Sequence, residues 1–376
     1  MSTVHEPDAR RPTAAHIDLK AFDRNVDAVL ARLPAGSKMV AVLKADAYGH
    51  GAVELARRCG SRAAAIAVAL LEEAVELRDA GIDLPILVLT PLQGEQFDIL
   101  FSRNVTPGVA GPEMLEELIA RAMAAGWKGE IHLKLDSGMG RMGFVESDLE
   151  ALAASLQQAR GIRVAGIYTH FANASDPADP HTEKQIEVFR RMVARLRELG
   201  SSAPLHHAAN SAAIMRGLIE PGDWARAGIV LYGAEPMDEG GTRLEPVLRW
   251  TSQIMRLKTL AAGSPVGYGL SHRTSRESRI ATLPVGYADG YSRSLSNRAE
   301  VLVRGKRAPV VGRVSMDLVT IDVTDIEGAA PGDEVVLIGR QGESEIPVEE
   351  LAEKSGTIPW ETLCAISARV PRIYHE

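Results

Sequence analysis

The chain has 376 residues, with 42 Lys and Arg against 49 Asp and Glu and a formal net charge of -7. At roughly 150 residues per domain, this length predicts about two domains. Hydrophobic residues are 45% of the chain and charged residues 24%, which excludes a disordered chain or a fibrous rod. The mild acidity also argues against a general nucleic-acid binder, because no basic stripe is available to neutralise phosphates.

The cysteines and the N-terminal segment indicate a cytoplasmic protein. Cys59 and Cys364 lie far apart and suggest neither a disulfide framework nor a metal site. No apolar stretch follows the pair Arg10-Arg11, so we expect no secretory signal. The longest apolar run near the start, 63–71, is far shorter than the ~20 residues that cross a membrane. We therefore expect no membrane segment.

Short apolar runs alternate with amphipathic stretches across residues 39–233, the pattern of repeated βα units around a parallel sheet. The runs predicted as strands are 39–43, 64–69, 85–90, 104–109, 131–135, 164–169, 205–209 and 228–233. Eight such units predict a closed (β/α)8 barrel. One intervening helix, with Gly200 as its stop, is predicted by apolar residues at helical spacing: Ile186, Phe189, Val193 and Leu196.

The composition changes at 237–246, a Gly- and charge-rich stretch that is typical of an interdomain linker. The β-branched runs that follow predict strands at 279–285, 299–305, 317–323 and 333–339. Helical periodicity returns only at 348–354. We therefore expect residues 1–240 to form the barrel and residues 241–376 to form a mostly antiparallel β domain.

In a barrel, the residues that follow the strands line the mouth where active sites form. Lys44 closes the first strand, which would carry its amine into a partly desolvated mouth suited to Schiff-base chemistry; a lysine snorkelling at a strand end is the alternative. The glycines of 138–143 match the dinucleotide fingerprint in spacing, but the next strand ends in Thr169-His170 rather than in an acidic residue. We interpret this segment as a tight loop that presents Arg141 to an anion, with a plain glycine turn as the alternative.

Polar groups near the later strand ends leave several roles open. His170, His206 and His207 could pack in the core, support other groups or bind a metal, although no HxH motif or acidic cluster favours a metal. The pairs at 210–211 and 228–229 offer hydroxyl and backbone N–H donors where barrels commonly hold a phosphate. A helix N-cap explains the serine of the first pair equally well.

Taken together, these segments resemble the bacterial alanine racemases, which are pyridoxal-phosphate (PLP) enzymes with a barrel followed by a β domain. The match runs nearly end to end and has seven motifs in order. They are VLKADAYGHG (42–51), LDSGMGRMG (135–143), THFA (169–172), ANSA (209–212), RAGI (226–229), GYADG (286–290) and SMD (315–317). The resemblance implies a homodimer that acts on alanine.

The resemblance also implies a role for each motif toward PLP. Lys44 would hold the cofactor as an internal aldimine. Its phosphate would be held by Tyr48, Ser211, Gly228 and Ile229, with Asn210 close by. Arg226, supported by His170, would face the pyridine nitrogen. An arginine does not readily give up its proton, so the ring would be a weaker electron sink than one paired with an aspartate.

Racemisation removes the α-proton from one face and returns it on the other, so two opposed bases suffice where a single base is awkward. The resemblance assigns Lys44 to the D-face and Tyr268, from the second subunit, to the L-face. It implies that Arg141 lies near the phenolic oxygen of the cofactor and, with the backbone N–H of Met316, binds the substrate carboxylate. Tyr287 would line the entrance.

Two positions bear on finer properties. Lys134 matches a family position that is often carbamylated and then steadies Arg141. Ala368 stands where some relatives have a tyrosine, so a larger pocket that admits serine is an alternative to strict use of alanine. A PLP-dependent decarboxylase of the same architecture is disfavoured by Arg226, and a non-enzymatic PLP carrier by residues 247–376. We expect an alanine racemase that supplies D-alanine for peptidoglycan.

Overall fold

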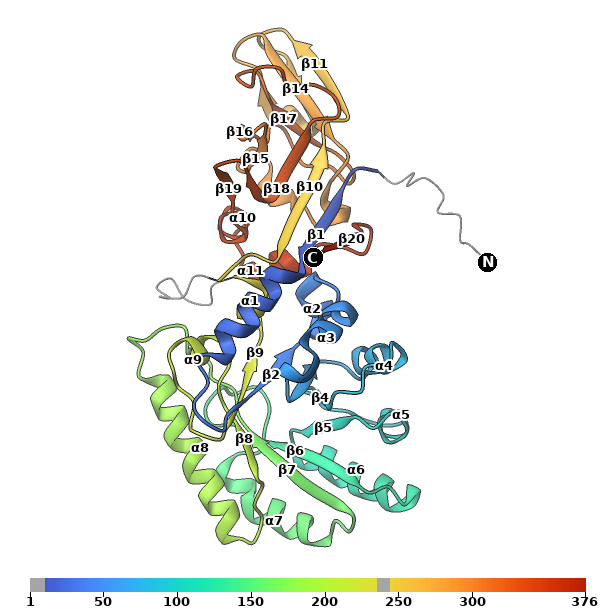
Figure 1. Cartoon of the computed structure of the whole chain (residues 1–376), viewed down its shortest axis with the longest axis vertical. Coiled ribbons are helices and arrows are strands. Elements are labelled where there is room, and N and C mark those ends of the chain that lie inside the picture. The colour runs from blue at the N-terminus through green and yellow to red at the C-terminus, as the bar shows by residue number, and fades with distance from the viewer. Residues whose placement is uncertain (1–10, 235–243) are drawn as a thin grey trace. The chain divides into compact units, whose positions relative to one another are not determined.

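The computed structural model of the chain describes residues 11–234 and 244–376 (Figure 1). The predicted linker at 237–246 and the predicted boundary after residue 240 fall mainly within 235–243, which lies outside the described residues. Contacts divide the chain into two compact units, and each unit carries its own sheet.

The unit Phe22–Glu245, called the barrel unit below, is a (β/α)8 barrel. Its strands are β2 (Lys38–Val42), β3 (Ala65–Val68), β4 (Ile86–Val88), β5 (Thr106–Val109), β6 (Gly129–Lys134), β7 (Ile162–Tyr168), β8 (Leu205–His207) and β9 (Trp224–Ala227). They are parallel and ordered β8-β7-β6-β5-β4-β3-β2-β9. Within the described residues no ladder joins β8 to β9, although Arg226 N donates to Ala209 O at 3.0 Å. The predicted barrel is thus confirmed, and it is nearly closed.

The first seven predicted strands are confirmed within a few residues, but the eighth is wrong. Residues Ile229–Tyr232 form a 3-10 helix, η3, and the strand is the preceding segment Trp224–Ala227. Apolar runs predict burial, and a short buried run can be a helix or a strand. The strand β9 contains the buried Arg226, so its sequence is not a continuous apolar run and hydropathy does not indicate a strand there. Arg226 therefore lies in β9 and not before the last strand.

Helices surround the strands of the barrel unit (Figure 1). They are α1 (Leu19–Leu30), α3 (Ala52–Cys59), α4 (Leu71–Asp79), α5 (Gln96–Ser102), α6 (Pro112–Ala125), α7 (Leu149–Gln158), α8 (His181–Glu198) and α9 (Ser211–Met215). The predicted helix before Gly200 is α8, which buries Phe189 and Leu196 while Ile186 and Val193 stay half-buried. Because α9 is only 5 residues long, it covers little of the seam between β8 and β9.

The second unit, called the β-rich unit, joins the described residues up to Ala21 to Pro246–Glu376. Its strands are β1 (Ala14–Asp18), β10 (Leu248–Gln253), β11 (Arg256–Leu260), β12 (Pro265–Val266), β13 (His272–Arg273), β14 (Ser278–Leu283), β15 (Glu300–Val303), β16 (Lys306–Pro309), β17 (Val319–Asp322), β18 (Glu334–Gln341), β19 (Ser344–Ile346) and β20 (Arg372–His375). The helices are α10 (Val348–Ser355) and α11 (Pro359–Cys364). The predicted mostly antiparallel domain is confirmed, as are its four predicted strands and its helix at 348–354.

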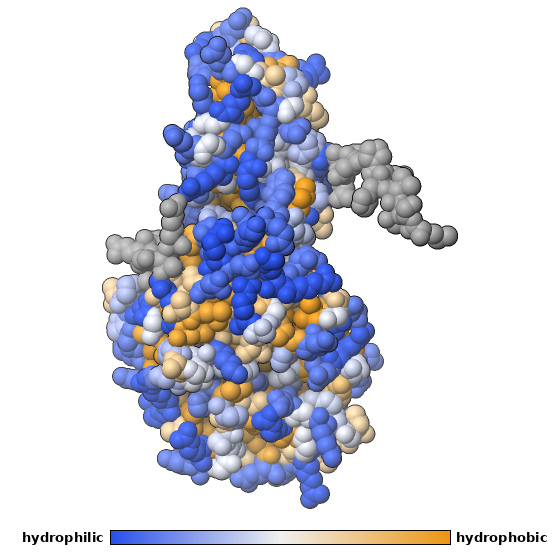
Figure 2. All heavy atoms as spheres, in the orientation of Figure 1, coloured by the Kyte–Doolittle hydropathy of each residue, from blue (hydrophilic) through white to orange (hydrophobic). Residues whose placement is uncertain are grey.

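Strand β1 was assigned to the barrel by the sequence, but it belongs to the β-rich unit. It pairs antiparallel with β10 and parallel with β20. The order of that sheet is β16-β15-β18-β10-β1-β20, and β11-β14-β17 form a second sheet. The side of the molecule drawn in Figure 2 is largely covered by hydrophilic residues (blue), with hydrophobic patches (orange) on the barrel unit. In the described part of the chain, no helix is both long and apolar enough to span a membrane.

A buried ion pair holds one turn of the β-rich unit. Asp289, which is 0% exposed, ends the 3-10 turn η5 (Tyr287–Asp289). Its carboxylate accepts hydrogen bonds from Arg11 Nη1 at 2.8 Å and from Gly286 N at 2.9 Å. Burial alone would raise the pKa of Asp289, but the hydrogen bond from Arg11 holds it below the ordinary value. This pair therefore fixes the turn that carries Tyr287.

Replacing Arg11 by glutamine is expected to lower the free energy of unfolding by about 2 kcal/mol at neutral pH, because Asp289 then stays buried without its main partner. A carboxyl whose pKa is lowered by folding stabilises the fold above its ordinary pKa of 3.8 and loses that contribution as the pH falls through its folded value. The difference in the free energy of unfolding between the parent and Arg11→Gln, measured with urea, should therefore be smaller below about pH 4. Arg24→Gln, which breaks an exposed pair with Glu245, is the control with a small effect. A pH-independent difference would contradict the prediction.

Candidate active site

The first strand of the barrel ends in an unusual turn. The element α2 (Lys44–Gly49) has four residues, Ala45 to Tyr48, with φ of 52, 51, 53 and 53°. Left-handed backbone costs L-residues roughly 1–2 kcal/mol each, so the turn is strained, as backbone at functional sites often is. Asp46 Oδ1 supports it by accepting a hydrogen bond from Ala52 N at 2.7 Å. Lys44 and Tyr48 thus stand at the two ends of one rigid turn.

Hydroxyl and backbone groups form a small cradle at the ends of β8 and β9. Ser211 Oγ accepts a hydrogen bond from Gly228 N at 2.9 Å. A Cβ added to Gly228 would lie 2.9 Å from the Tyr48 hydroxyl oxygen and 3.5 Å from Ser211 Oγ. Ile229 follows as the first residue of η3. Asn210, not Ser211, is the N-cap of α9, since its Oδ1 accepts a helix N–H at 3.1 Å. Ser211 is therefore not engaged as a cap.

The glycine segment after β6 forms the predicted tight loop. Asp136 Oδ1 accepts the N–H groups of Gly138 at 2.9 Å and Gly140 at 3.1 Å. At Gly143, where φ is 127°, a Cβ would lie 2.6 Å from Asp136 N, so the turn requires glycine. Arg141 is exposed at its tip and has no hydrogen-bond or ion-pair partner among the residues that the structure describes. Its guanidinium is available for an anion.

Arg226 is a buried cation that neutral groups surround. It is 4% exposed, and Nη1 donates to His207 Nδ1 at 2.9 Å. Nη2 donates to Thr169 O at 2.7 Å and to His170 Nδ1 at 3.2 Å. Burial lowers the pKa of Arg226 to about 10, so the side chain stays protonated at neutral pH. Both Nη atoms are thus fully engaged, and the orientation of the guanidinium is fixed.

The hydrogen-bond chain also fixes the protons of two histidines. Because Arg226 only donates, His207 Nδ1 accepts and its ring proton lies on Nε2. That nitrogen is 2.7 Å from His132 Nδ1, which must accept in turn. Burial lowers the pKa of His132 to about 4 and that of His207 well below the ordinary value. Both rings are therefore neutral, and each accepts a hydrogen bond at Nδ1. These hydrogen bonds explain the two histidines without a metal ion.

Sequence reasoning missed His132 altogether. His132 and Lys134 are two residues apart in β6, so both point into the barrel, and the alternation within this strand could have revealed the pair. Lys134 is 5% exposed, and its Nζ lies 5.8 Å from the centroid of the Tyr168 ring. Burial, with the nearby Arg141 and Arg226, lowers the pKa of Lys134 to about 8. Roughly a tenth of the amine is uncharged near neutral pH.

Three predicted residues are exposed in the β-rich unit, and the turn of Tyr268 lies beside the segment that leads to Met316, since a Cβ added to Gly267 would lie 3.1 Å from Arg313 N. Tyr268, in the turn η4 (Tyr268–Leu270), is 74% exposed, Met316 is 53% and Tyr287 is 42% exposed. Tyr287 N donates to Ser315 O at 3.0 Å, so the Tyr287 turn lies beside Met316. Within the described ranges the N–H of Met316 has no acceptor. His206 is the predicted residue that stands apart, on the outer side of β8.

The barrel unit thus brings together Lys44, Tyr48, Ser211, Arg226 and Gly228 at the C-terminal ends of its strands. In the described ranges, no group of three His, Cys, Asp or Glu side chains could hold a metal ion. A lysine, nearby hydroxyl groups and a fixed arginine at a barrel mouth are the kinds of groups that can hold an anionic ligand beside an amine, as in many barrel enzymes.

The chain matches both domains of one protein family in sequence. The alanine racemase N-terminal domain matches residues 17–236, and the alanine racemase C-terminal domain matches residues 247–374. The chain belongs to the alanine racemase family. The resemblance drawn from the seven motifs is confirmed.

Relatives match over nearly the whole chain. The alanine racemase of Sorangium cellulosum is 44% identical over 380 residues, which cover 97% of this chain and 100% of that protein. That of Halothermothrix orenii is 41% identical over 369 residues, 97% of each. The crystal structure of alanine racemase from Bacillus anthracis with bound L-Ala-P has a TM-score of 0.93 at 37% identity and covers 98% of this chain and 96% of that one. The structure from E. faecalis has a TM-score of 0.91 at 37% identity, with 97% and 98% covered.

Proposed function

We propose that this protein interconverts L-alanine and D-alanine with PLP as cofactor, acting as a cytoplasmic homodimer that supplies D-alanine for peptidoglycan. One observation carries the proposal: the strained turn after β2 places Lys44 at its start and the Tyr48 hydroxyl of the anion cradle at its end. Membership of the alanine racemase family supports it. Neither the decarboxylase nor the carrier alternative is favoured by the relatives found.

The barrel residues suit the three functional groups of PLP. The space beside Gly228 that a Cβ would fill, with the hydroxyls of Tyr48 and Ser211, suits the phosphate. Lys44 would bind the aldehyde carbon through Nζ. The Nε–H of Arg226 has no acceptor within the described part of the chain, unlike its Nη groups, and suits the ring nitrogen. Arg226 would donate a hydrogen bond there without giving up its proton.

PLP, when bound, withdraws electrons from the α-carbon of the amino acid and acidifies its α-proton. Lys44 Nζ would take and return that proton on the D-face, and the Tyr268 hydroxyl would do so on the L-face. Arg141 and the N–H of Met316 would hold the carboxylate, which fixes the α-carbon between the two bases. Because Arg226 would keep its proton, the ring nitrogen would stay unprotonated and the ring would withdraw electrons less strongly, which disfavours side reactions.

The dimer is supported by the exposed apolar residues of the β-rich unit. Besides the three predicted site residues, Leu270 is 56% exposed and Leu318 is 40% exposed. Such clusters are typical of surfaces that contact a partner. We propose that this surface faces the barrel of a second subunit, so that Tyr268 and Met316 complete the partner's site and Tyr287 lines its entrance.

The function is tested by incubating the protein, loaded with PLP, with L-alanine in D2O while α-proton loss and chirality are followed together. D-alanine with an α-deuterium is the expected product. Alanine that stays unexchanged would overturn the proposal, and release of carbon dioxide from a basic amino acid would favour a decarboxylase. Running L-serine in parallel measures the substrate range that Ala368, which is exposed, leaves open.

Gly228→Ala is expected to weaken PLP binding by about tenfold or more, roughly 1.4 kcal/mol, because the new Cβ would lie 2.9 Å from the Tyr48 hydroxyl oxygen. Titration of the apoprotein with PLP, followed by visible absorption, measures this. If the clash with the Tyr48 hydroxyl is the cause, Gly228→Ala should weaken PLP binding much less in the Tyr48→Phe variant than in the parent protein. An equal cost in both backgrounds would contradict the explanation.

Lys134 is expected to carry a carbamate, because burial leaves part of its amine uncharged at neutral pH. The nitrogen would bond to the carbon of carbon dioxide and lose a proton to solvent, which gives an anion able to pair with Arg141. NMR in 13C-bicarbonate should show a carbamate signal that disappears in Lys134→Arg and persists in the control Lys128→Arg, a change at an exposed lysine. A signal that survives in Lys134→Arg would contradict the assignment.

A further inference from the structure

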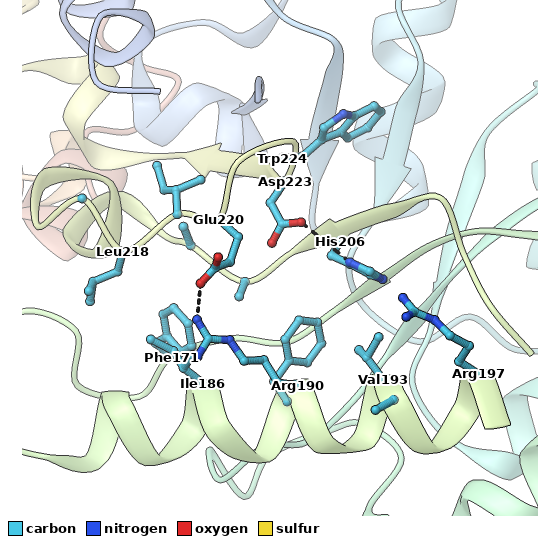
Figure 3. Close-up of a pocket in the computed structure, with 16 residues that line it drawn as sticks. Phe171, Ile186, Arg190, Val193, Arg197, His206, Leu218, Glu220, Asp223 and Trp224 are labelled. Atoms are coloured by element: carbon cyan, nitrogen blue, oxygen red, sulfur yellow. Dashed lines mark hydrogen bonds and ion pairs between the residues drawn. The ribbon is translucent and has the colours of Figure 1, made fainter. Parts of the chain in front are cut away.

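The barrel unit has a pocket of about 410 Å³ on the outer side of β8, away from the mouth (Figure 3). Helix α8 forms one wall, and the loop 217–223 with the start of β9 forms the other. The apolar part of the lining includes Phe171, Ile186, Phe189, Val193, Leu218 and Ile219. This volume and lining are typical of a site for a small organic molecule.

The pocket lies where the helix between β8 and β9, which would cover the outside of the barrel, is unusually short. Helix α9 has 5 residues, and the chain then runs as a loop to β9. In a barrel of this class a full helix would pack over the outer face of the strands. None of Lys44, Tyr48, Arg141 and Arg226 lines the pocket, so it is distinct from the proposed active site.

One carboxylate in the pocket is poorly satisfied. The Asp223 side chain is 20% exposed and points toward His206, with 3.7 Å between Asp223 Oδ1 and His206 Nδ1. That separation is too long for a hydrogen bond, and no other side-chain partner of Asp223 is found in the described ranges. Burial raises the pKa of Asp223 to about 6 and lowers that of His206. Near neutral pH an ionised carboxylate thus faces a neutral imidazole.

Four charged side chains line the pocket: Arg190, Arg197, Glu220 and Asp223. Glu220 points into the same space, and it forms an ion pair with Arg190 of α8 (Figure 3). The four charges sum to zero over the pocket, but Glu220 engages Arg190, so Asp223 is a carboxylate without a closely paired cation. Arg197 lies on the far side of His206 and is exposed, where an ion pair would contribute little because water screens it.

We propose that this pocket binds a small organic ammonium ion with an aromatic or branched apolar body. The ammonium N–H would donate to the Asp223 carboxylate, and the apolar body would pack between Phe171 and Phe189. A partly buried carboxylate without a hydrogen-bond donor gains a charge-assisted hydrogen bond in this way. A ligand carboxylate would instead meet Asp223 and Glu220 and be repelled.

Isothermal titration of the PLP-loaded protein with N,N-dimethyl-2-phenylethylammonium tests the proposal. This tertiary amine cannot form a carbon–nitrogen double bond with the cofactor aldehyde, so the visible PLP band should not change while heat is released. Asp223→Asn should weaken binding by about tenfold or more. Glu187→Gln makes the same charge change on α8 outside the pocket lining and should leave the affinity unchanged.

3-Phenylpropionate, which has a similar body and the opposite charge, should bind at least about tenfold more weakly than the ammonium. Equal binding of the two probes, no binding of the ammonium, or unchanged affinity in Asp223→Asn would overturn the proposal. If Asp223→Asn does not fold, Ala194→Phe decides the matter, since Ala194 lines the pocket from the exposed side of α8. The new ring should fill the space and abolish ammonium binding, and retained binding would count against the assignment.

Discussion

Replacing Lys44 by alanine is expected to abolish racemisation, with a loss of at least about a thousandfold in rate. The change removes both the amine that would bond to PLP and the proposed D-face base. It keeps two hydrogen bonds that support the turn, from Ala52 N to Asp46 and from Ala45 N to Glu73. The variant should therefore fold and bind PLP non-covalently.

Two measurements separate this outcome from misfolding. Chirality of alanine after long incubation reports the reaction, and the visible band of PLP bonded to a lysine should be lost. Lys38→Ala is the matched control, since Lys38 is exposed at the opposite end of the same strand β2, and it should keep the parent rate. Racemisation by Lys44→Ala at the parent rate would contradict the proposed function.

The barrel could be predicted because burial on both faces makes parallel strands apolar throughout. Strand β3, for example, is buried at every position. Strand β9 is the exception, because it contains the buried Arg226. Its hydrogen-bond acceptors include His207 of β8 and Thr169, which follows β7, and partners so distant in sequence leave no trace in local hydropathy. Strand β1 was misplaced for a related reason, since its pairing with β10 joins segments more than two hundred residues apart in the chain.

The site residues could be named from motifs, but their geometry could not. The sequence Ala-Asp-Ala-Tyr at 45–48 has no glycine, so propensity argues against four successive positive φ values. Tertiary hydrogen bonds, such as that from Ala45 N to Glu73, hold the turn. The proton positions on His207 and His132 likewise follow only from the fixed donors of Arg226.

Tyr268→Phe is expected to reduce racemisation in both directions by about a hundredfold or more, because it deletes the proposed L-face acid–base group and keeps the ring. Lys44 would still act on the D-face, so α-proton exchange of D-alanine in D2O should persist without inversion. Tyr374→Phe, in β20 of the same unit, is the control that should keep full activity. Parallel loss of exchange and racemisation would assign Tyr268 a structural role instead.

Mixing the two inactive variants tests whether subunits share sites. If Tyr268 completes the partner's site, a mixed dimer of Lys44→Ala and Tyr268→Phe chains has one site with both changes and one with neither. Random exchange makes half of the dimers mixed, so about a quarter of the parent activity should return. If each chain supplied both groups to its own site, every site would carry one lesion and mixing would restore nothing. Recovered activity therefore reports directly on which chain donates Tyr268.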